Sequence, residues 1–396
     1  MNPLAISRYS VVNALGTGSD AVSAALLAGR SGLAKCDFEA LEIDTCIGRI
    51  AGLETLRVRP DLDAFDCRNN RLAQLALETD GFADAVGAAA KRYGAARIGV
   101  FVGTSTSGIL ETELAYRRRD PASGALPADF HYAETQNTGS LAEFVRRYLD
   151  LRGPAFVVSS ACSSSAKVFG NAARMIAAGA CDAAVVGGVD TLCLTTLCGF
   201  HALQLTASGP CRPYDAERDG ISIGEGAGFA LLERPAQAAG GSHLLLGVGE
   251  SCDAHHMSTP HPEGLGARLA MQGALQSSGL GAGDIDYVNL HGTASRTNDA
   301  AEDRAIVDLF GPKTPCSSTK GSTGHLLGAA GITEAVVSLL AISNGVMPGG
   351  INTRRLDPEL RANFLLEARQ APVRRVLSNS FGFGGTNCSL VLGASG

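Results

Sequence analysis

The sequence lacks the features that mark several common classes of protein. It has no tryptophan, no two cysteines at C-x-x-C spacing and no apolar run of about 18 residues, the length that a membrane helix needs. Its 11 cysteines are odd in number and scattered, which argues against a disulfide framework or a zinc site and for a reducing compartment. The first residues, Met1 to Ser7, have no basic stretch followed by an apolar core, so no signal peptide is expected. We therefore expect a cytoplasmic protein without a membrane span.

Charge and composition narrow the class further. The formal net charge is −6, so the surface as a whole is not suited to nucleic acid, and any attraction to an acidic partner must come from a local basic patch. Hydrophobic residues make up 45% of the chain, charged residues 18%, and there are 49 glycines. This is the composition of an α/β enzyme with a large core, and 396 residues are enough for two domains or two halves of one unit.

Strand-like and helix-like segments alternate along the chain, which predicts sheets rich in parallel pairs and covered by helices. The stretch Pro235–Ser242, rich in Ala and Gly, is the best candidate for a seam, and it divides the chain into residues 1–240 and 241–396. Both parts have a similar order of elements but no identifiable sequence repeat. Strands are expected at 6–12, 97–103, 155–158, 182–189, 228–232, 243–248, 285–290, 375–380 and 389–392. Helices are expected at 21–28, 70–92, 111–119, 141–149, directly after Cys162, and at 265–279, 301–310 and 328–340.

One cysteine lies where a strand is expected to turn into a helix. Cys162 follows the apolar run Ala155–Val158 and precedes a segment with helical spacing. A thiol at this place faces the free N–H groups and the positive end of the helix dipole. Both favour the thiolate, which is the nucleophilic form. The alternative is a small, buried and inert cysteine.

Three further segments carry more glycine and small polar residues than packing requires. They are 289–295, 320–331 and 379–387, and each follows an expected strand, where open α/β sheets place their sites. Taken singly, His291 and His325 are more often structural histidines than catalysts. The glycines at 382–385 are weak evidence for a phosphate cradle, and the nearby Lys and Gly residues lack Walker A spacing.

Together these segments resemble the elongating β-ketoacyl-acyl-carrier-protein synthases of fatty acid and type II polyketide synthesis, which belong to the thiolase superfamily. The combination Cys-His-His is similar to the elongating class, because a thiolase has a second Cys and the initiating synthases have Cys-His-Asn. The resemblance implies an α/β, thiolase-like fold of two pseudo-duplicated halves in a layered αβαβα arrangement. Its motifs are Ser-Ser-Ala-Cys-Ser, Arg212–Asp215, Arg218–Gly220, Gly224–Gly228, Asp253–Met257, His-Gly-Thr, Gly-His-Leu-Leu-Gly-Ala-Ala-Gly and Asn-Ser-Phe-Gly-Phe-Gly-Gly-Thr-Asn.

The resemblance implies a decarboxylative Claisen condensation. Cys162 would accept an acyl chain from an acyl carrier protein, and a carbanion formed from malonyl-acyl carrier protein by loss of CO₂ would extend it by two carbons. Neutral His291 and His325 would donate Nε–H bonds to the enolate oxygen.

Other site residues follow from the same resemblance. Lys320 would neighbour the second histidine and help to set its tautomer, with Glu302 as its buried acidic partner; the alternative for Glu302 is a carboxylate on a helix surface. Phe381 would supply an oxyanion-hole N–H beside that of Cys162 and act as a gate. Thr293 and Ser295 would bind the phosphopantetheine arm.

The resemblance also assigns residues to the substrates and the carrier protein. Ile221, Thr106 and Phe383 would border the acyl substrate, and Arg212 would meet the acidic carrier protein. Arg68, Arg71 and Arg117 to Arg119 could extend that basic patch or be solvated surface residues. Arg296 and Ile221 depart from the family pattern, which fits a polyketide or aryl-polyene pathway as readily as fatty acid synthesis.

The implied enzyme needs no metal and no organic cofactor, because its substrates are carried on the phosphopantetheine of the carrier protein. A dimer is implied, with a second copy of the chain or with a related subunit. Two alternatives stay open at this point. One is a non-catalytic partner subunit of the chain-length-factor type, and the other is a thiolase or an initiating synthase.

Overall fold

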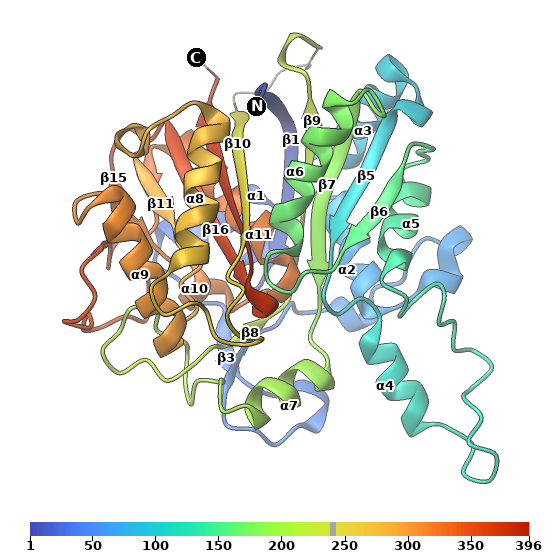
Figure 1. The fold of residues 1–396 in the computed structure, drawn as a ribbon. Coiled ribbons are helices and arrows are strands. Elements are labelled where there is room, and N and C mark those ends of the chain that lie inside the picture. Colours follow the sequence, from blue (N-terminus) through green and yellow to red (C-terminus); the bar gives the residue numbers. More distant parts are fainter. Residues whose placement is uncertain (238–242, 396) are drawn as a thin grey trace.

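The strands of the first half form one end of the large sheet. The structure is a computed structural model that describes residues 1–237 and 243–395 (Figure 1). In the first half, two antiparallel pairings are followed by two parallel ones. The spatial order is β1 (Leu4–Asn13), β9 (Gly226–Glu233), β7 (Ala183–Asp190), β5 (Ile98–Gly103) and β6 (Ala155–Val158).

The second half repeats this pattern strand for strand. Its pairings are again two antiparallel and then two parallel, with one further parallel strand at the edge. This shared topology is the pseudo-duplication that we expected, in the absence of a sequence repeat. The spatial order is β10 (His243–Cys252), β17 (Thr386–Ala394), β16 (Arg375–Gly382), β11 (Tyr287–Asn289), β12 (Pro315–Ser317) and β14 (Asn363–Phe364).

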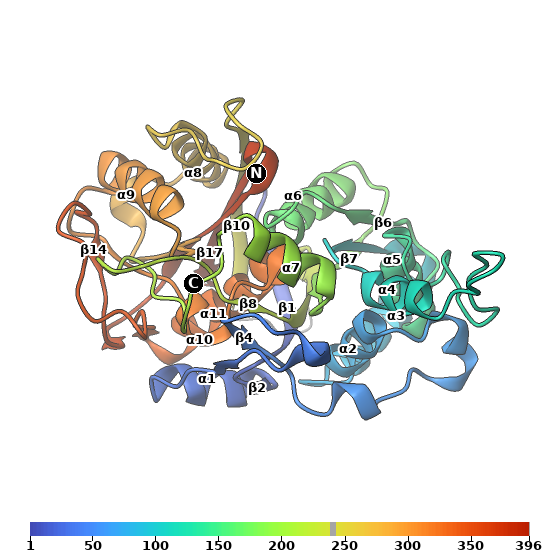
Figure 2. The same ribbon diagram turned by 90° about the horizontal axis from the view of Figure 1, so that it is seen from below.

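The two halves join at one short antiparallel contact. Strand β1 pairs with β10 only from Leu4 to Ile6, opposite His243 to Leu245. Beyond this contact the halves diverge, and helices α6 (Ser164–Ala177) and α11 (Ala330–Asn344) lie between them (Figures 1 and 2). Each of these helices contacts strands of both halves, and they contact one another.

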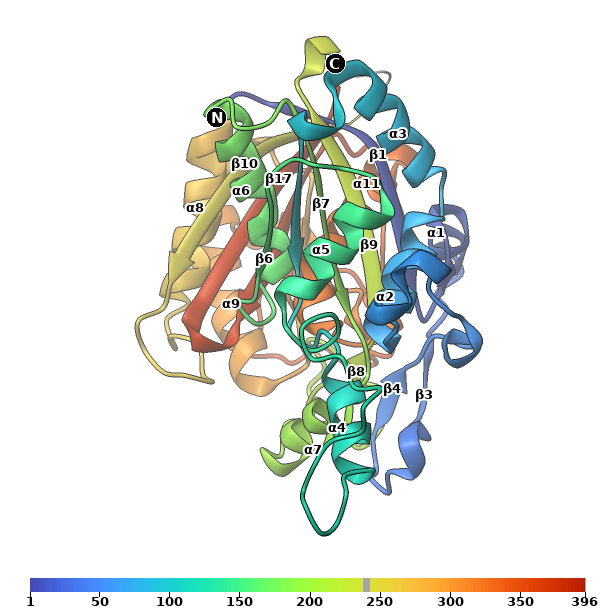
Figure 3. The same ribbon diagram turned by 90° about the vertical axis from the view of Figure 1, so that its right-hand side faces the viewer.

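The remaining helices cover the outer faces and complete the layered αβαβα arrangement. Figure 3 shows the outer face of the first half, which is covered by α2 (Arg68–Leu77), α3 (Phe82–Tyr93) and α5 (Gly139–Tyr148). Helix α8 (Leu265–Ser278) covers the second half, with α9 (Arg296–Phe310) beside it. The other elements are α1 (Ser19–Leu27), α4 (Ile109–Arg117), α7 (Leu194–Ala202), α10 (Lys320–Thr323), β2 (Gly16–Thr17), β3 (Leu33–Lys35), β4 (Cys46–Gly48), β8 (Ile223–Gly224), β13 (Val346–Met347) and β15 (Arg369–Gln370).

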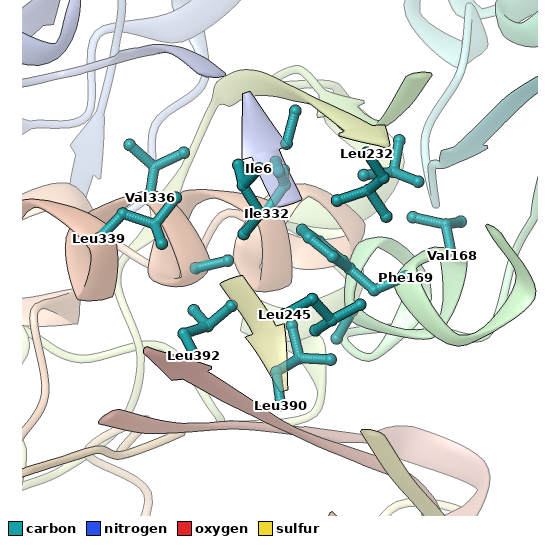
Figure 4. Packing of buried hydrophobic residues seen from close by; sticks show 14 of the residues in the cluster. Ile6, Val168, Phe169, Leu232, Leu245, Ile332, Val336, Leu339, Leu390 and Leu392 are labelled. Carbon is teal, nitrogen blue, oxygen red and sulfur yellow. The ribbon is translucent and has the colours of Figure 1, made fainter. Parts of the chain in front are cut away.

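The middle layer is an apolar core shared by both halves. Phe169 of α6 and Ile332 of α11 pack among Leu232, Leu245 and Leu390 (Figure 4). A Cβ atom at Gly331 would lie 2.5 Å from the backbone nitrogen of Ala166, so the absence of a side chain there lets the two helices approach closely.

One stretch passes the length and composition test for a membrane span, against our expectation from the sequence. It is Leu327–Asn344, and 83% of it is buried inside the fold. Because its side chains pack in the middle layer, its hydrophobicity is explained by core packing.

Local structure differs from expectation at a few places. The helix expected over 70–92 is two helices, because Asp80 and Gly81 have φ of 57° and 66° and left-handed residues cannot continue a right-handed helix. Each sheet half is mixed, not mainly parallel. The boundary expected between residues 240 and 241 lies outside the described residues and stays a prediction.

The shared core generates the first prediction. We expect Phe169→Ala to lower the free energy of unfolding by about 3–5 kcal/mol, because it leaves a cavity where both halves meet. Leu203→Ala, at a side chain that is 61% exposed, serves as the control and should cost less than about 0.5 kcal/mol. Denaturant unfolding followed by circular dichroism measures both, and an equal loss would contradict a shared core.

Candidate active site

The chain turns sharply between β6 and α6, and this turn presents Cys162. Ala161 has a φ of 51°, and the hydroxyl of Ser164 donates to the Ala161 carbonyl at 2.6 Å while accepting from the amide of Ser160 at 2.9 Å. These bonds hold the Cys162 sulfur just before the first turn of α6, in a buried position.

The Cys162 thiol is protonated at rest, which corrects the expectation of a thiolate. Burial raises its pKa to about 12; the Lys320 charge and the backbone N–H of Phe383 act in the opposite direction with smaller effect. Loss of water around the sulfur disfavours the charged form more than the helix end favours it.

Two histidines from the second half meet this thiol. His325 Nε2 lies 3.0 Å from Cys162 Sγ, and the His291 ring lies 5.2 Å from the His325 ring, centroid to centroid, at 81°. His291 follows β11, and His325 follows α10 with its backbone tied to Ser222 and Gly224 of the first half. The four polar segments therefore converge, as their places after strands predicted.

Both histidines are neutral, as expected. Burial is the largest cause that lowers the pKa of each, and the Lys320 charge lowers it further. Lys320 neighbours the first histidine, not the second as we expected: its Nζ lies 3.4 Å from His291 Nδ1. Because an ammonium group only donates, His291 Nδ1 accepts and its proton is on Nε2.

The acidic partner of Lys320 is Glu334, not Glu302. Lys320 Nζ donates to the Glu334 carboxylate and to the His291 carbonyl. Glu302 instead accepts the amides of His291 and Gly292, both at 2.8 Å. It is buried, so the alternative of a surface carboxylate is also wrong. Burial raises the pKa of Glu302 and of Glu334 to about 7.

Sequence reasoning missed Glu334, although a signal was present. It is the sole acidic residue of α11, an otherwise apolar helix that is buried along most of its length. A lone carboxylate in such a helix requires a buried cation, and Lys320 is the lysine ten residues before α11 begins.

The amide that bonds the Cys162 sulfur belongs to Phe383; the oxyanion-hole N–H and the gating role expected of Phe381 stay predictions. Phe381 lies within β16 opposite Asn387, with its ring 5.8 Å from that of His291. Phe383 lies in the turn after β16, and its ring packs 5.7 Å from that of Phe200. The reason is geometric: β16 continues through Gly382, so the turn that reaches the thiol begins two residues later than expected.

A pocket of about 650 Å³ opens onto the thiol and both histidines. Among the predicted substrate residues, Ile221, Thr293, Ser295 and Phe383 line it. The hydroxyls of Thr293 and Ser295 lie 3.1 Å apart. Thr106 does not line this pocket in the described part of the chain, because its hydroxyl donates to the buried Asp190.

The predicted arginines have different environments. Arg68 is buried and makes a two-pronged ion pair with Glu225, so it cannot belong to a surface patch. Arg71 pairs with Asp66. Arg212 donates to the Glu217 carbonyl and lies 3.6 Å from Asp219. Arg117 and Arg118 are exposed and pair with acidic neighbours, and a role of these residues in binding a partner stays a prediction.

The side chains of Cys162, His291 and His325 also have the spacing of a possible metal site. One ligand atom each of Cys162, His291 and His325 lies within 4.8 Å of the others. Thiolate and imidazole are ligands that Zn²⁺ accepts. The Lys320 ammonium beside His291 opposes a second cation at this place.

Comparisons with known proteins agree with this geometry. Family models described as the N-terminal and C-terminal domains of β-ketoacyl synthase match residues 1–238 and 243–354. The chain is 34% identical over 405 residues to 3-oxoacyl-[acyl-carrier-protein] synthase 2 of Coxiella burnetii, covering 98% of this chain and 97% of that one. It is 38% identical over 311 residues to the synthase of the same name from Rhizobium meliloti, covering 74% and 73%.

A solved structure is similar over the full length. It is the ketosynthase (ApeO) in complex with its chain length factor (ApeC) from Xenorhabdus doucetiae, with a TM-score of 0.90 and 38% identity. The match covers 100% of this chain and 98% of that one.

The buried ion pair generates a prediction about stability. We expect Glu334→Ala to lower the free energy of unfolding by about 3–5 kcal/mol, because it leaves the Lys320 ammonium buried without its partner. Glu217→Ala, which removes an exposed pair with Arg355, should cost less than about 1 kcal/mol. Thermal and denaturant unfolding report both changes; a small effect of Glu334→Ala would contradict the role of this buried pair in stability.

The protonated thiol generates a prediction about pH. Since the pKa of Cys162 is about 12, we expect its alkylation by iodoacetamide to become about tenfold faster per pH unit from pH 7 to 9, without a plateau. Peptide mapping by mass spectrometry separates Cys162 from the exposed Cys198 and Cys252. A plateau below pH 8 would instead indicate a thiolate stabilised by the helix end.

Proposed function

The chain belongs to the β-ketoacyl synthase family and is a β-ketoacyl-acyl-carrier-protein synthase, an acyltransferase, and we propose how its site carries out the condensation. The observation that carries the proposal is the convergence of Cys162, His291 and His325 in one pocket, with 3.0 Å between His325 Nε2 and the sulfur. The reaction that uses all three residues is acyl transfer followed by carbon–carbon bond formation.

In the first step, Cys162 accepts the acyl chain. Its sulfur attacks the thioester carbonyl, the bond from that carbonyl to the phosphopantetheine sulfur breaks, and the thiol proton ends on the departing carrier thiol. The N–H groups of Cys162 and Phe383 support the oxyanion. A thiol with a high resting pKa becomes reactive as its proton is transferred, and His325 Nε2 and the Phe383 amide stabilise the sulfur charge during that transfer.

In the second step, a malonyl thioester loses CO₂ and its electron pair forms an enolate. The Nε2–H groups of neutral His291 and His325 donate to the enolate oxygen. The carbanion attacks the acyl carbonyl on Cys162, the C–S bond breaks, and the thiolate takes one proton from solvent. Thr293 and Ser295, which line the pocket and whose hydroxyls contact each other, hold the phosphopantetheine arm of the carrier protein.

We propose that no metal and no organic cofactor take part. The Lys320 charge beside His291 fills the electrostatic role that a cation would have. The reaction needs polarisation and nucleophilic attack only, and the residues present supply both.

The partners proposed are an acyl carrier protein and a second ketosynthase-like subunit, either a copy of this chain or a chain length factor such as the partner of the Xenorhabdus relative. Strand β6 lies at the end of the sheet order and exposes Phe156, which supports association along this edge. We propose a cytoplasmic location, and a fatty acid or polyketide pathway as the setting.

The alternative of a non-catalytic chain-length-factor subunit is disfavoured by the same geometry. Such a subunit has no use for a thiol in contact with a histidine, yet this contact is intact here. A thiolase or an initiating synthase is disfavoured by His325 and by the absence of a cysteine from residues 379–387.

The experiment follows acyl transfer and decarboxylation separately. We expect Cys162→Ala to accept no label from an acyl-loaded carrier protein, as seen by intact mass. Cys67→Ala should be labelled normally; Cys67 is also buried, has a pKa raised by burial to about 12 and precedes α2, but does not line the pocket. Label on Cys162→Ala would overturn the assignment of the nucleophile.

The histidines are tested by decarboxylation of malonyl-acyl carrier protein. We expect His291→Ala and His325→Ala each to slow CO₂ release by about 10²–10³-fold, because each removes one donor to the enolate oxygen. A wild-type rate in either variant would show that its histidine does not stabilise the enolate.

A further inference from the structure

Asp190, at the end of β7, is a buried carboxylate that does not line the pocket. It accepts hydrogen bonds from two segments that belong to different halves. From the loop after β5 it accepts the Thr104 hydroxyl at 2.7 Å, and the Thr106 hydroxyl and the amides of Ser105 and Thr106, each at 2.8 Å. From the second half it accepts the amide of Gly328 at 2.5 Å.

Each of these segments leads directly to one partner of the central contact in the active site. Gly328 lies three residues after His325, in a tight turn where Leu327 has a φ of 50°. Ser105, in the other segment, donates from its hydroxyl to the Ala161 carbonyl at 3.3 Å. Ala161 is the left-handed residue that presents Cys162. One carboxylate thus connects the segment that carries the imidazole with the turn that carries the thiol.

The contact between the two segments has no spare room. A Cβ atom at Gly328 would lie 2.8 Å from the nearer Asp190 oxygen and 2.9 Å from the Ser105 amide nitrogen. The amides of Gly328 and Ser105 can converge on Asp190 only because this position has no side chain.

We propose that Asp190 is a positioning residue that sets the distance between Cys162 Sγ and His325 Nε2 across the junction of the two halves. The proposal rests on the proposed function, because it assigns this distance to acyl transfer. A displacement of about 1 Å at a reacting pair is enough to cost about 10²-fold in rate.

The first test compares two buried carboxylates in single-turnover acylation of Cys162. Asp190→Asn keeps the shape but turns an N–H group toward donors, so we expect acylation about 10–100-fold slower than in the wild type. The control is Asp303→Asn, because Asp303 is buried and accepts the amides of Arg361 and Ala362 away from the pocket. Equal acylation rates in the two variants at similar melting temperatures would overturn the proposal.

The second test separates positioning from charge. The Asp190 charge raises the pKa of Cys162, so if Asp190 acted only through its charge, Asp190→Asn would speed alkylation of Cys162 by iodoacetamide at pH 8. If Asp190 instead positions the two residues, Asp190→Asn slows the alkylation, because the sulfur loses its contact with the His325 imidazole, which stabilises its charge. Slower alkylation supports the proposal and faster alkylation overturns it.

Gly328→Ala provides an independent variant that keeps the Asp190 charge. We expect it to slow both acylation and alkylation, and it serves if Asp190→Asn does not fold. Unchanged rates in Gly328→Ala would contradict the proposal. If wild-type Cys162 accepts no acyl group at all, the proposed function fails, whereas the alkylation comparison still decides the role of Asp190.

Discussion

The active site depends on one buried charge, the ammonium group of Lys320. It is held by the Glu334 carboxylate and the His291 carbonyl, and it faces His291 Nδ1. From this position it assigns the His291 proton to Nε2, adds to the larger effect of burial that keeps both histidines neutral, and partly offsets the cost of charge on Cys162. Since a buried cation is tolerated only with its partners in place, the helix that carries Glu334 and the segment that carries His291 must be correctly packed before the site has its electrostatic properties.

The duplicated topology explains why the site lies at the junction of the halves. In each half the parallel strands end at the same edge, and helices α6 and α11 run from that edge through the middle layer. The turn before α6 carries the thiol, and the segments before α11 and after β11 carry the imidazoles. Neither half alone has both the thiol and the two imidazoles, so the short β1–β10 contact and the shared core hold together two incomplete sites.

Much of this site could be predicted from the sequence because its members follow strands. Cys162, His291 and His325 lie in small polar segments at expected strand ends, which converge in parallel pairs, and the resemblance to the elongating synthases assigns their roles. The identity of the Lys320 partner could not be obtained in this way, because Glu302 and Glu334 are both acidic residues near a site histidine and only the packing of α11 decides between them. The protonation of Cys162 also escaped prediction, since the position before a helix is visible in the sequence but the degree of burial is not. Which phenylalanine amide reaches the thiol depends on where β16 ends, and β16 ends two residues later than expected.

The high resting pKa of Cys162 has a consequence for the survival of the enzyme. Peroxides and similar oxidants attack the thiolate, and its conversion to sulfinic or sulfonic acid is generally irreversible. Because burial raises the pKa of Cys162 to about 12, the thiol form dominates at neutral pH. The sulfur is therefore a poor target for oxidants while the pocket waits for substrate, and burial protects the residue that we propose as the nucleophile.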